Sequence, residues 1–202
     1  MARTAPETQR NILDYFSDGK AIPLGIKLFG IKTKLIDISD LLYFREILIK
    51  NSALIILSRR KNFVRQSISH LRMEILMEET KRKYGESHHS PITEGDIIGK
   101  HNIDLELFCH LIDHFDKLDK EIIEFVHSTG KSFETIFYED IVHSPERIIA
   151  RLSGLFDYDL IVHNYKVTLK HTPSDLSSVV LNYDELLDRI KGSPYEEMLQ
   201  LP

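Results

Sequence analysis

Residues 54–69 read LIILSRRKNFVRQSIS. The apolar run at the start of this stretch stops at Ser58, and three cations follow at once: Arg59, Arg60 and Lys61. An apolar run of this length that ends in a polar turn predicts a buried strand of a parallel sheet. Ligands of open α/β sheets bind beyond the carboxyl ends of the strands. The three cations therefore stand where an anionic ligand would bind.

Predicted strands and helices alternate on both sides of this stretch. The patterns predict strands at residues 25–29, 53–58 and 132–138. They predict helices at 37–51, 62–83 and 103–128, another from Ser144-Pro145 to about Gly154, and two short ones in 181–199. The serine is expected to cap its helix and the proline to occupy the first turn. This alternation predicts an α/β fold with a parallel sheet flanked by helices.

Composition limits the classes of protein. A chain of 202 residues fits a single domain, residues 1–202, with a full core. A net charge of −5 disfavours nucleic acid as a partner. One cysteine, Cys109, excludes a disulfide framework and a cysteine zinc site. No apolar run is long enough for a membrane span, and residues 1–16 lack the apolar core of a secretory signal, so we expect a cytoplasmic location.

The basic stretch has the chemistry of a phosphate site. Phosphate binding needs backbone N–H groups at a helix start together with nearby cations. Arginine offers a planar fork that matches phosphate oxygens, and the hydroxyls of Ser67 and Ser69 would add donors. Each hydrogen bond to a charged group contributes about 1.5–3 kcal/mol, so two or three would hold a nucleotide phosphate. The plain alternative, which composition alone favours, is a basic, solvated first turn of a helix.

Two other groups of residues have weaker signals. Tyr138-Glu139-Asp140 follows a predicted strand, where the acids would orient a basic neighbour or cap the turn. The alternative, favoured locally, is a strand-end turn with a buried tyrosine. His110 and His114 have the i,i+4 spacing of metal ligands, but no HExxH motif and no third ligand accompany them, so we predict no metal site. The sequence also contains neither a G-x-x-x-x-G-K-[ST] loop nor a G-x-G-x-x-G motif.

Three segments, in this order and spacing, resemble the sulfotransferase superfamily, in particular the bacterial branch with nodulation and trehalose sulfotransferases. They are LIILSRRKNFVRQSIS (54–69), FETIFYEDIVHSPERIIARLSGLFDYDL (133–160) and LNYDELLDRIKGSPYEEML (181–199). GIKLF (25–29) is similar to a further strand of that family, and the resemblance covers roughly residues 20–200. It implies a P-loop-NTPase-like sulfotransferase fold with a three-layer parallel sheet. The implied reaction is sulfuryl transfer from 3′-phosphoadenosine 5′-phosphosulfate to a hydroxyl or amine of a small-molecule or glycan acceptor.

The resemblance assigns the 3′-phosphate site residue by residue. Ser69 matches the serine of the family motif, whose arginine usually stands eight or nine positions earlier. Lys61 occupies the first of these positions and Arg60 the second. We expect Arg60 to bind the phosphate, with Arg59 and Lys61 as neighbours able to substitute. The Tyr-Glu-Asp turn is expected to give structural support, and Lys170 is a loose match to basic residues of the family's C-terminal nucleotide loop.

The chain departs from the family pattern at its beginning. The family opens with a strand and a Ser/Thr-rich loop for the 5′-phosphosulfate, and its acid–base residue usually lies in the first third. Neither is visible before residue 20, so we expect an N-terminally truncated or a degenerate member. The catalytic residue stays unassigned, with His70 and His101 as candidates, and the loop 84–101 is the expected acceptor loop. The alternative function is a non-catalytic remnant that binds the nucleotide or acts as an interaction module; the oligomeric state is left open.

Overall fold

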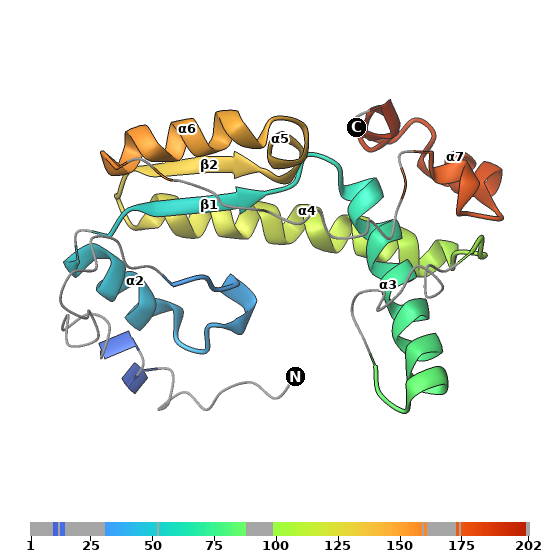
Figure 1. Cartoon of the computed structure of the whole chain (residues 1–202), viewed down its shortest axis with the longest axis horizontal. Helices are drawn as coiled ribbons and strands as arrows, with labels where there is room; N and C mark the ends of the chain where they lie inside the picture. The colour runs from blue at the N-terminus through green and yellow to red at the C-terminus, as the bar shows by residue number, and fades with distance from the viewer. Residues whose placement is uncertain are drawn as a thin grey trace. The chain divides into compact units, whose positions relative to one another are not determined.

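A computed structural model of the chain describes residues 10–11, 13–14, 31–51, 53–87, 99–158, 160, 173 and 175–200. Its regular elements, in chain order, are η1 (Leu35–Asp37), α2 (Leu41–Lys50), β1 (Ile55–Arg59), α3 (Phe63–Tyr84), α4 (Leu105–Ser128), β2 (Phe133–Phe137), α5 (Tyr138–His143), α6 (Pro145–Phe156), η3 (Leu176–Ser178), α7 (Tyr183–Ile190) and η4 (Glu196–Gln200) (Figure 1). Most of these residues are helical, and β1 and β2 pair as a small parallel sheet.

The predicted α/β class is confirmed in this general form. The two strands and the two long helices occur where the sequence predicts them, within two residues at each end. The third predicted strand, 25–29, lies outside the described residues, and the three-layer sheet stays a prediction. The long helices also end as their sequences require. Gly85 closes α3 with a φ of 82°, and its N–H donates to the carbonyl oxygen of Lys81.

Two local predictions were wrong. Of the helix expected at 37–51, residues 41–50 form α2, which begins only after Asp40, whose Oδ1 accepts a hydrogen bond from Tyr43 N at 2.9 Å; η1 is a separate turn at 35–37. Ser144 and Pro145 occupy the predicted N-cap and first helical positions of α6, but the side chain of Ser144 makes no capping hydrogen bond. The helix ends at Phe156, two residues after the predicted Gly154. A glycine inside a helix costs only about 1 kcal/mol relative to alanine, so it does not by itself end the helix.

By the density of contacts the chain divides into two units. Unit 1 comprises residues 1–57 and 119–135, and unit 2 comprises residues 58–118 and 136–202. All three changes of unit along the chain fall inside regular elements, namely β1, α4 and β2. Within unit 1, the rings of Phe44 and Phe125 stack with their centroids 5.9 Å apart. This contact fixes α2 against the second half of α4.

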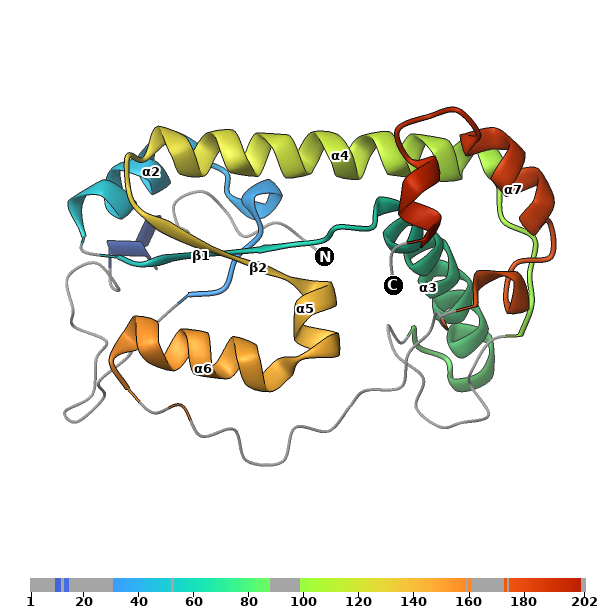
Figure 2. The same cartoon turned by 90° about the horizontal axis from the view of Figure 1, so that it is seen from above.

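Unit 2 contains the main hydrophobic core. Its buried residues come from the start of α3, from Ile103 and the first half of α4, and from the segment between η3 and α7 (Figure 2). They are Phe63, Val64, Ile68, Leu71, Ile103, Phe108, Leu111, Ile112, Leu176, Val179, Val180, Leu186 and Ile190. Arg72 is fully buried among them, and its Nη1 donates to the carbonyl oxygens of Gly99 and Val179, each at 3.0 Å. The core thereby fixes the beginning of α3, the helix that follows the basic residues.

Candidate anion-binding site

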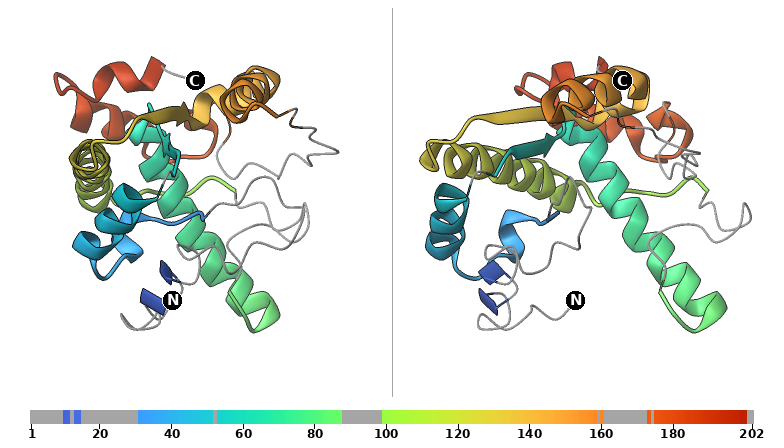
Figure 3. Two further views of the ribbon diagram at one scale, coloured as in Figure 1. Left: turned by 90° about the vertical axis from the view of Figure 1, so that its left-hand side faces the viewer. Right: turned by 60° about the vertical axis from the view of Figure 1, so that its left-hand side comes forward.

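The basic residues lie at the carboxyl end of β1. We call Arg59–Lys61 the basic turn; it joins β1 to α3, and the right view of Figure 3 shows α3 continuing directly from the end of β1. Tyr138–Asp140, the YED turn, forms the first turn of α5 directly after β2. Since β1 and β2 run parallel and side by side, these two turns meet at the same edge of the sheet (Figure 1). Both turns belong to unit 2.

The three cations of the basic turn lie against the aromatic side chains at the end of β2. The guanidinium carbon of Arg60 is 3.9 Å from the centroid of the Tyr138 ring, and that of Arg59 is 5.3 Å from the Phe137 centroid. Lys61 Nζ is 4.8 Å from the Phe137 centroid. A cation over a ring face is attracted by the negative face of the π system. The rings therefore gather positive charge at this edge of the sheet.

Glu139 supplies an anion to the start of α3. Its Oε2 accepts a hydrogen bond from Lys61 N at 3.0 Å, and its Oε1 accepts one from Asn62 N at 3.3 Å. The residue is only 7% exposed, so the carboxylate is held inside the turn. A helix start attracts anions because its backbone N–H groups and its dipole point outward. These two backbone donors beside the basic turn are thus occupied by a carboxylate of the chain itself.

The neighbouring acid, Asp140, contacts a side chain instead of the backbone. Its Oδ1 accepts a hydrogen bond from Lys61 Nζ at 2.6 Å, and both side chains are 40% exposed. The expected buried tyrosine of this turn is wrong: Tyr138 is exposed, and Glu139 is the buried member. The acids do what the sequence indicated for them, since one caps the turn and the other orients a basic neighbour.

Asn62, which the sequence treated only as the helix start, connects three segments. It is 1% exposed. Its Oδ1 accepts from Arg65 N at 2.9 Å and caps α3, while its Nδ2 donates to the carbonyl oxygen of Met198 at 2.6 Å. An asparagine just before a helical run is a recognisable cap signal, so its first role was detectable. Its hydrogen bond to Met198, 136 positions later in the chain, could not be detected from the sequence.

The two serines of the motif lie further along α3. Ser69 is half-buried, seven residues after Asn62 and on the same face, which corresponds to about 10 Å along the helix axis. Ser67 is completely buried, and its Oγ has no hydrogen-bond partner among the described residues. The structure thus brings Arg59, Arg60 and Lys61 together but does not bring Ser69 to the tip of the helix. A phosphate that touches both Arg60 and Ser69 would lie beside the first two turns of α3.

The other candidate residues occupy separate places. His70 packs edge-on against Phe115, and its Nε2 is 3.5 Å from Glu74 Oε1. His101 uses its backbone in a parallel bridge to Val180. The rings of His110 and His114 stack, but the described residues contain no cluster of three or more His, Cys, Asp or Glu side chains placed to hold a metal ion. Lys170, and most of the loop 84–101, lie outside the described residues.

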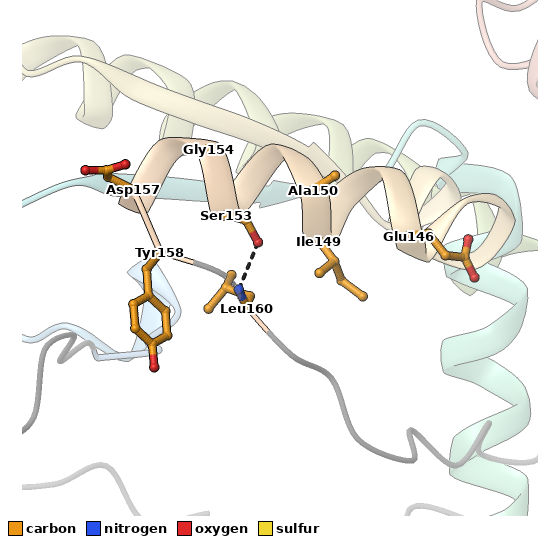
Figure 4. A pocket seen from close by; sticks show the side chains of 8 residues that line it. All are labelled: Glu146, Ile149, Ala150, Ser153, Gly154, Asp157, Tyr158 and Leu160. Atoms are coloured by element: carbon orange, nitrogen blue, oxygen red, sulfur yellow. Dashed lines mark hydrogen bonds between the residues drawn. The ribbon is translucent and has the colours of Figure 1, made fainter.

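An open groove runs along α6. It has a volume of about 720 Å³ and is lined by Glu146, Ile149, Ala150, Ser153, Gly154, Asp157, Tyr158 and Leu160 (Figure 4). Ser153 Oγ accepts a hydrogen bond from Leu160 N at 3.0 Å and holds the chain beneath the helix end. The charged residues that line the groove are both acidic. The groove therefore has the wrong charge for an anion and is distinct from the basic turn.

Comparison with protein-family models, with curated proteins and with solved structures gave no significant match. The geometry of the two turns is thus the basis for any functional assignment. Within the part of the chain that the structure describes, no helix has both the length and the hydropathy that crossing a membrane requires.

Proposed function

We propose that the chain is a sulfotransferase-type domain that binds the 3′-phosphate of 3′-phosphoadenosine 5′-phosphosulfate at the basic turn. The observation that carries the proposal is the gathering of Arg59, Arg60 and Lys61 at the joined carboxyl ends of β1 and β2. This is the edge at which open α/β sheets bind ligands. The resemblance of residues 54–69, 133–160 and 181–199 to sulfotransferases gives the chemical identity of the ligand.

The proposed reaction is an in-line sulfuryl transfer. The bond between sulfur and the 5′-phosphate oxygen breaks, and a new bond forms between sulfur and the acceptor oxygen or nitrogen. The acceptor proton passes to a general base, and 3′-phosphoadenosine 5′-phosphate leaves with the electron pair. Catalysis of such a transfer rests on positioning and on charge stabilisation, which cations at the nucleotide site supply.

A second candidate function is a non-catalytic nucleotide-binding module of the same origin. The observation in its favour is that both carboxylates beside the basic turn are already engaged. Glu139 accepts two backbone N–H groups, and Asp140 accepts from Lys61 Nζ. Neither carboxylate is therefore poised to take a proton from an acceptor, and the turn offers binding groups without an evident base.

Calorimetric titration with 3′-phosphoadenosine 5′-phosphate tests the binding proposal. Because a hydrogen bond to a charged group contributes about 1.5–3 kcal/mol, we expect Arg60→Ala to weaken binding about 10-fold or more. Arg60→Lys keeps the charge but loses the planar fork, so its affinity should be intermediate. Ser69→Ala should lose several-fold. Arg147→Ala, an exposed arginine of α6, is the matched control and should bind as the wild type does.

Equal affinity in the wild type and in the Arg60 and Ser69 variants would contradict the phosphate site. Transfer of labelled sulfuryl groups to a panel of hydroxyl and amine acceptors then separates the two candidate functions. Nucleotide binding with turnover supports the sulfotransferase. Binding without turnover on any acceptor supports the non-catalytic module.

A further inference from the structure

The two adjacent acids of the YED turn contact the basic turn in different ways. Glu139 is buried and accepts hydrogen bonds from the backbone N–H groups of Lys61 and Asn62. Those bonds determine where the chain leaves β1 and enters α3, and hence where Arg59 and Arg60 project. Hydrogen bonds that hold a binding group in place raise affinity because less conformational freedom is lost when the ligand binds. Glu139 therefore acts on the backbone that carries the cations.

Asp140 acts on a charge. Its carboxylate holds Lys61 Nζ at 2.6 Å, and both side chains are 40% exposed. An exposed ion pair of this kind adds little to stability. The ion pair should affect anion binding more than it affects stability. An incoming anion must compete with Asp140 for Lys61 and is repelled by the negative charge of Asp140. Lys61 stands eight positions before Ser69, one of the two spacings of the family motif, so this restraint falls on a residue assigned to the phosphate.

We infer that Glu139 is a positioning residue for the anion site and that Asp140 lowers its affinity by holding Lys61. The inference rests on the proposed function, since it deepens the account of the same site. Removal of the negative charge from these neighbouring residues should have opposite effects. Glu139→Gln should weaken nucleotide binding, and Asp140→Asn should strengthen it.

Titration of both variants with 3′-phosphoadenosine 5′-phosphate is the first test. We expect a loss of at least about 5-fold in Glu139→Gln, because the two N–H groups use different carboxylate oxygens and glutamine replaces one of these acceptors with an NH2 donor. We expect a gain of about 3-fold to 10-fold in Asp140→Asn. Glu139→Asp keeps the charge but shortens the reach, so it should weaken binding as Glu139→Gln does. If both neutral variants bind more tightly, general electrostatics is the cause and the positioning role is overturned. If both bind more weakly, the restraining role of Asp140 is overturned.

Amide hydrogen exchange without nucleotide is the second test, and it does not depend on the proposed function. The amides of Lys61 and Asn62 should exchange about 10-fold faster in Glu139→Gln, and as in the wild type in Asp140→Asn. The amide of Leu181, which donates to the carbonyl oxygen of His101 at 2.8 Å, is the internal reference for intact folding. Unchanged exchange at Lys61 and Asn62 in Glu139→Gln overturns the role of Glu139. A wild type that does not bind the nucleotide refutes the proposed function, while the exchange result still decides whether Glu139 fixes the turn.

Discussion

Asn62 is the residue on which the geometry of the anion site depends most directly. It stands between the basic turn and α3, is almost fully buried, and satisfies its amide on both sides. Oδ1 accepts from Arg65 N, and Nδ2 donates to the carbonyl oxygen of Met198 in η4. One side chain thus fixes the first turn of α3 and attaches the C-terminal segment to it. A buried polar group with all its partners present is costly to remove, because the partners are left unpaired.

We expect Asn62→Ala to lower the free energy of unfolding by about 1.5–5 kcal/mol. Loss of a cap costs about 0.5–2 kcal/mol, and the unpaired Met198 carbonyl adds about 1–3 kcal/mol. Asn62→Asp retains the capping oxygen but places a buried carboxylate oxygen against the Met198 carbonyl oxygen, so it should destabilise at least as much as alanine. Urea denaturation of the three proteins measures the difference. A loss below about 0.5 kcal/mol in Asn62→Ala would show that these contacts do not stabilise the fold.

Tyr195 should give the chain a stability change at high pH. Burial, together with the hydrogen bond from its hydroxyl to Asp113 Oδ1 at 3.0 Å, raises the pKa of Tyr195 to about 12 from an ordinary 10.0. The folded state therefore favours the neutral phenol. The resulting stabilisation is complete below pH 10 and is lost as the pH rises towards 12.

Comparison with Tyr195→Phe isolates this effect, because lysines and the other tyrosines titrate in both proteins. The wild-type advantage in the free energy of unfolding should shrink between pH 10 and 12. Absorbance at the phenolate band should show one tyrosine that titrates late in the wild type and is missing from the variant. An advantage that stays constant across this range would mean that the phenol titrates normally.

At the scale of elements, alanine substitution of two glycines with different backbone conformations should change stability in opposite directions. Gly130 follows α4 with a φ of +64°, whereas Gly154 lies inside α6. A Cβ added at either position meets no atom within 4 Å, so steric overlap affects neither substitution. Gly154→Ala should stabilise by about 0.5–1 kcal/mol, because alanine loses less conformational freedom in a helix. Gly130→Ala should destabilise by about 1–2 kcal/mol, because an L-residue is strained there. Thermal unfolding of the pair checks the signs, and equal shifts would refute the argument.

The sequence was most informative about long elements and least informative about the side-chain contacts at their ends. The 22-residue α3 and the 24-residue α4 were predicted within two residues at each end, because their apolar spacing repeats over many turns. The boundaries of α6 were also predicted within two residues, since Pro145 begins this helix and Phe156 ends it. The capping bond expected of Ser144 is absent, because it depends on a side-chain conformation that the sequence does not specify. The third predicted strand lies outside the described residues and stays a prediction.

In the candidate site, too, features set by neighbouring residues could be predicted from the sequence, whereas contacts between residues far apart in the chain could not. The abrupt change from apolar residues to cations was enough to place Arg59, Arg60 and Lys61 at a strand end. The role of Glu139 was only one of several possibilities, because its partners Lys61 and Asn62 are 78 and 77 positions away. No periodic pattern reports a contact of that separation; it arises only when β1 and β2 pair.

At the scale of the whole molecule, the division into two units does not predict two independent unfolding steps. Each of the three changes of unit falls inside a strand or a helix, so both units share β1, α4 and β2. Neither unit can therefore unfold without disrupting an element that also belongs to the other unit. We expect a single calorimetric transition. A thermogram with two separated peaks would show that the units unfold independently in spite of the shared elements.

Calorimetry also measures how much the proposed ligand stabilises the folded chain. At 100 times its Kd, 3′-phosphoadenosine 5′-phosphate should stabilise the folded chain by about 2.7 kcal/mol, which raises Tm by about 5–10 °C for a protein of this size. Arg60→Ala should reduce the shift at the same nucleotide concentration, whereas the exposed-arginine control Arg147→Ala should retain it. An equal rise in Tm in the wild type and in Arg60→Ala would show that the nucleotide does not bind at the basic turn.

The bonds from Glu139 also couple the lengths of two loops that are far apart in the chain. One inserted residue lengthens a backbone by up to about 3.5 Å. A shift of that size would move Lys61 N, now 3.0 Å from Glu139 Oε2, out of hydrogen-bond distance. An insertion in either turn would therefore need a compensating change in the other. When relatives of this chain are aligned, gaps should avoid residues 59–62 and 137–140 together. A lineage that gains a residue in one turn should carry a matching change in its partner.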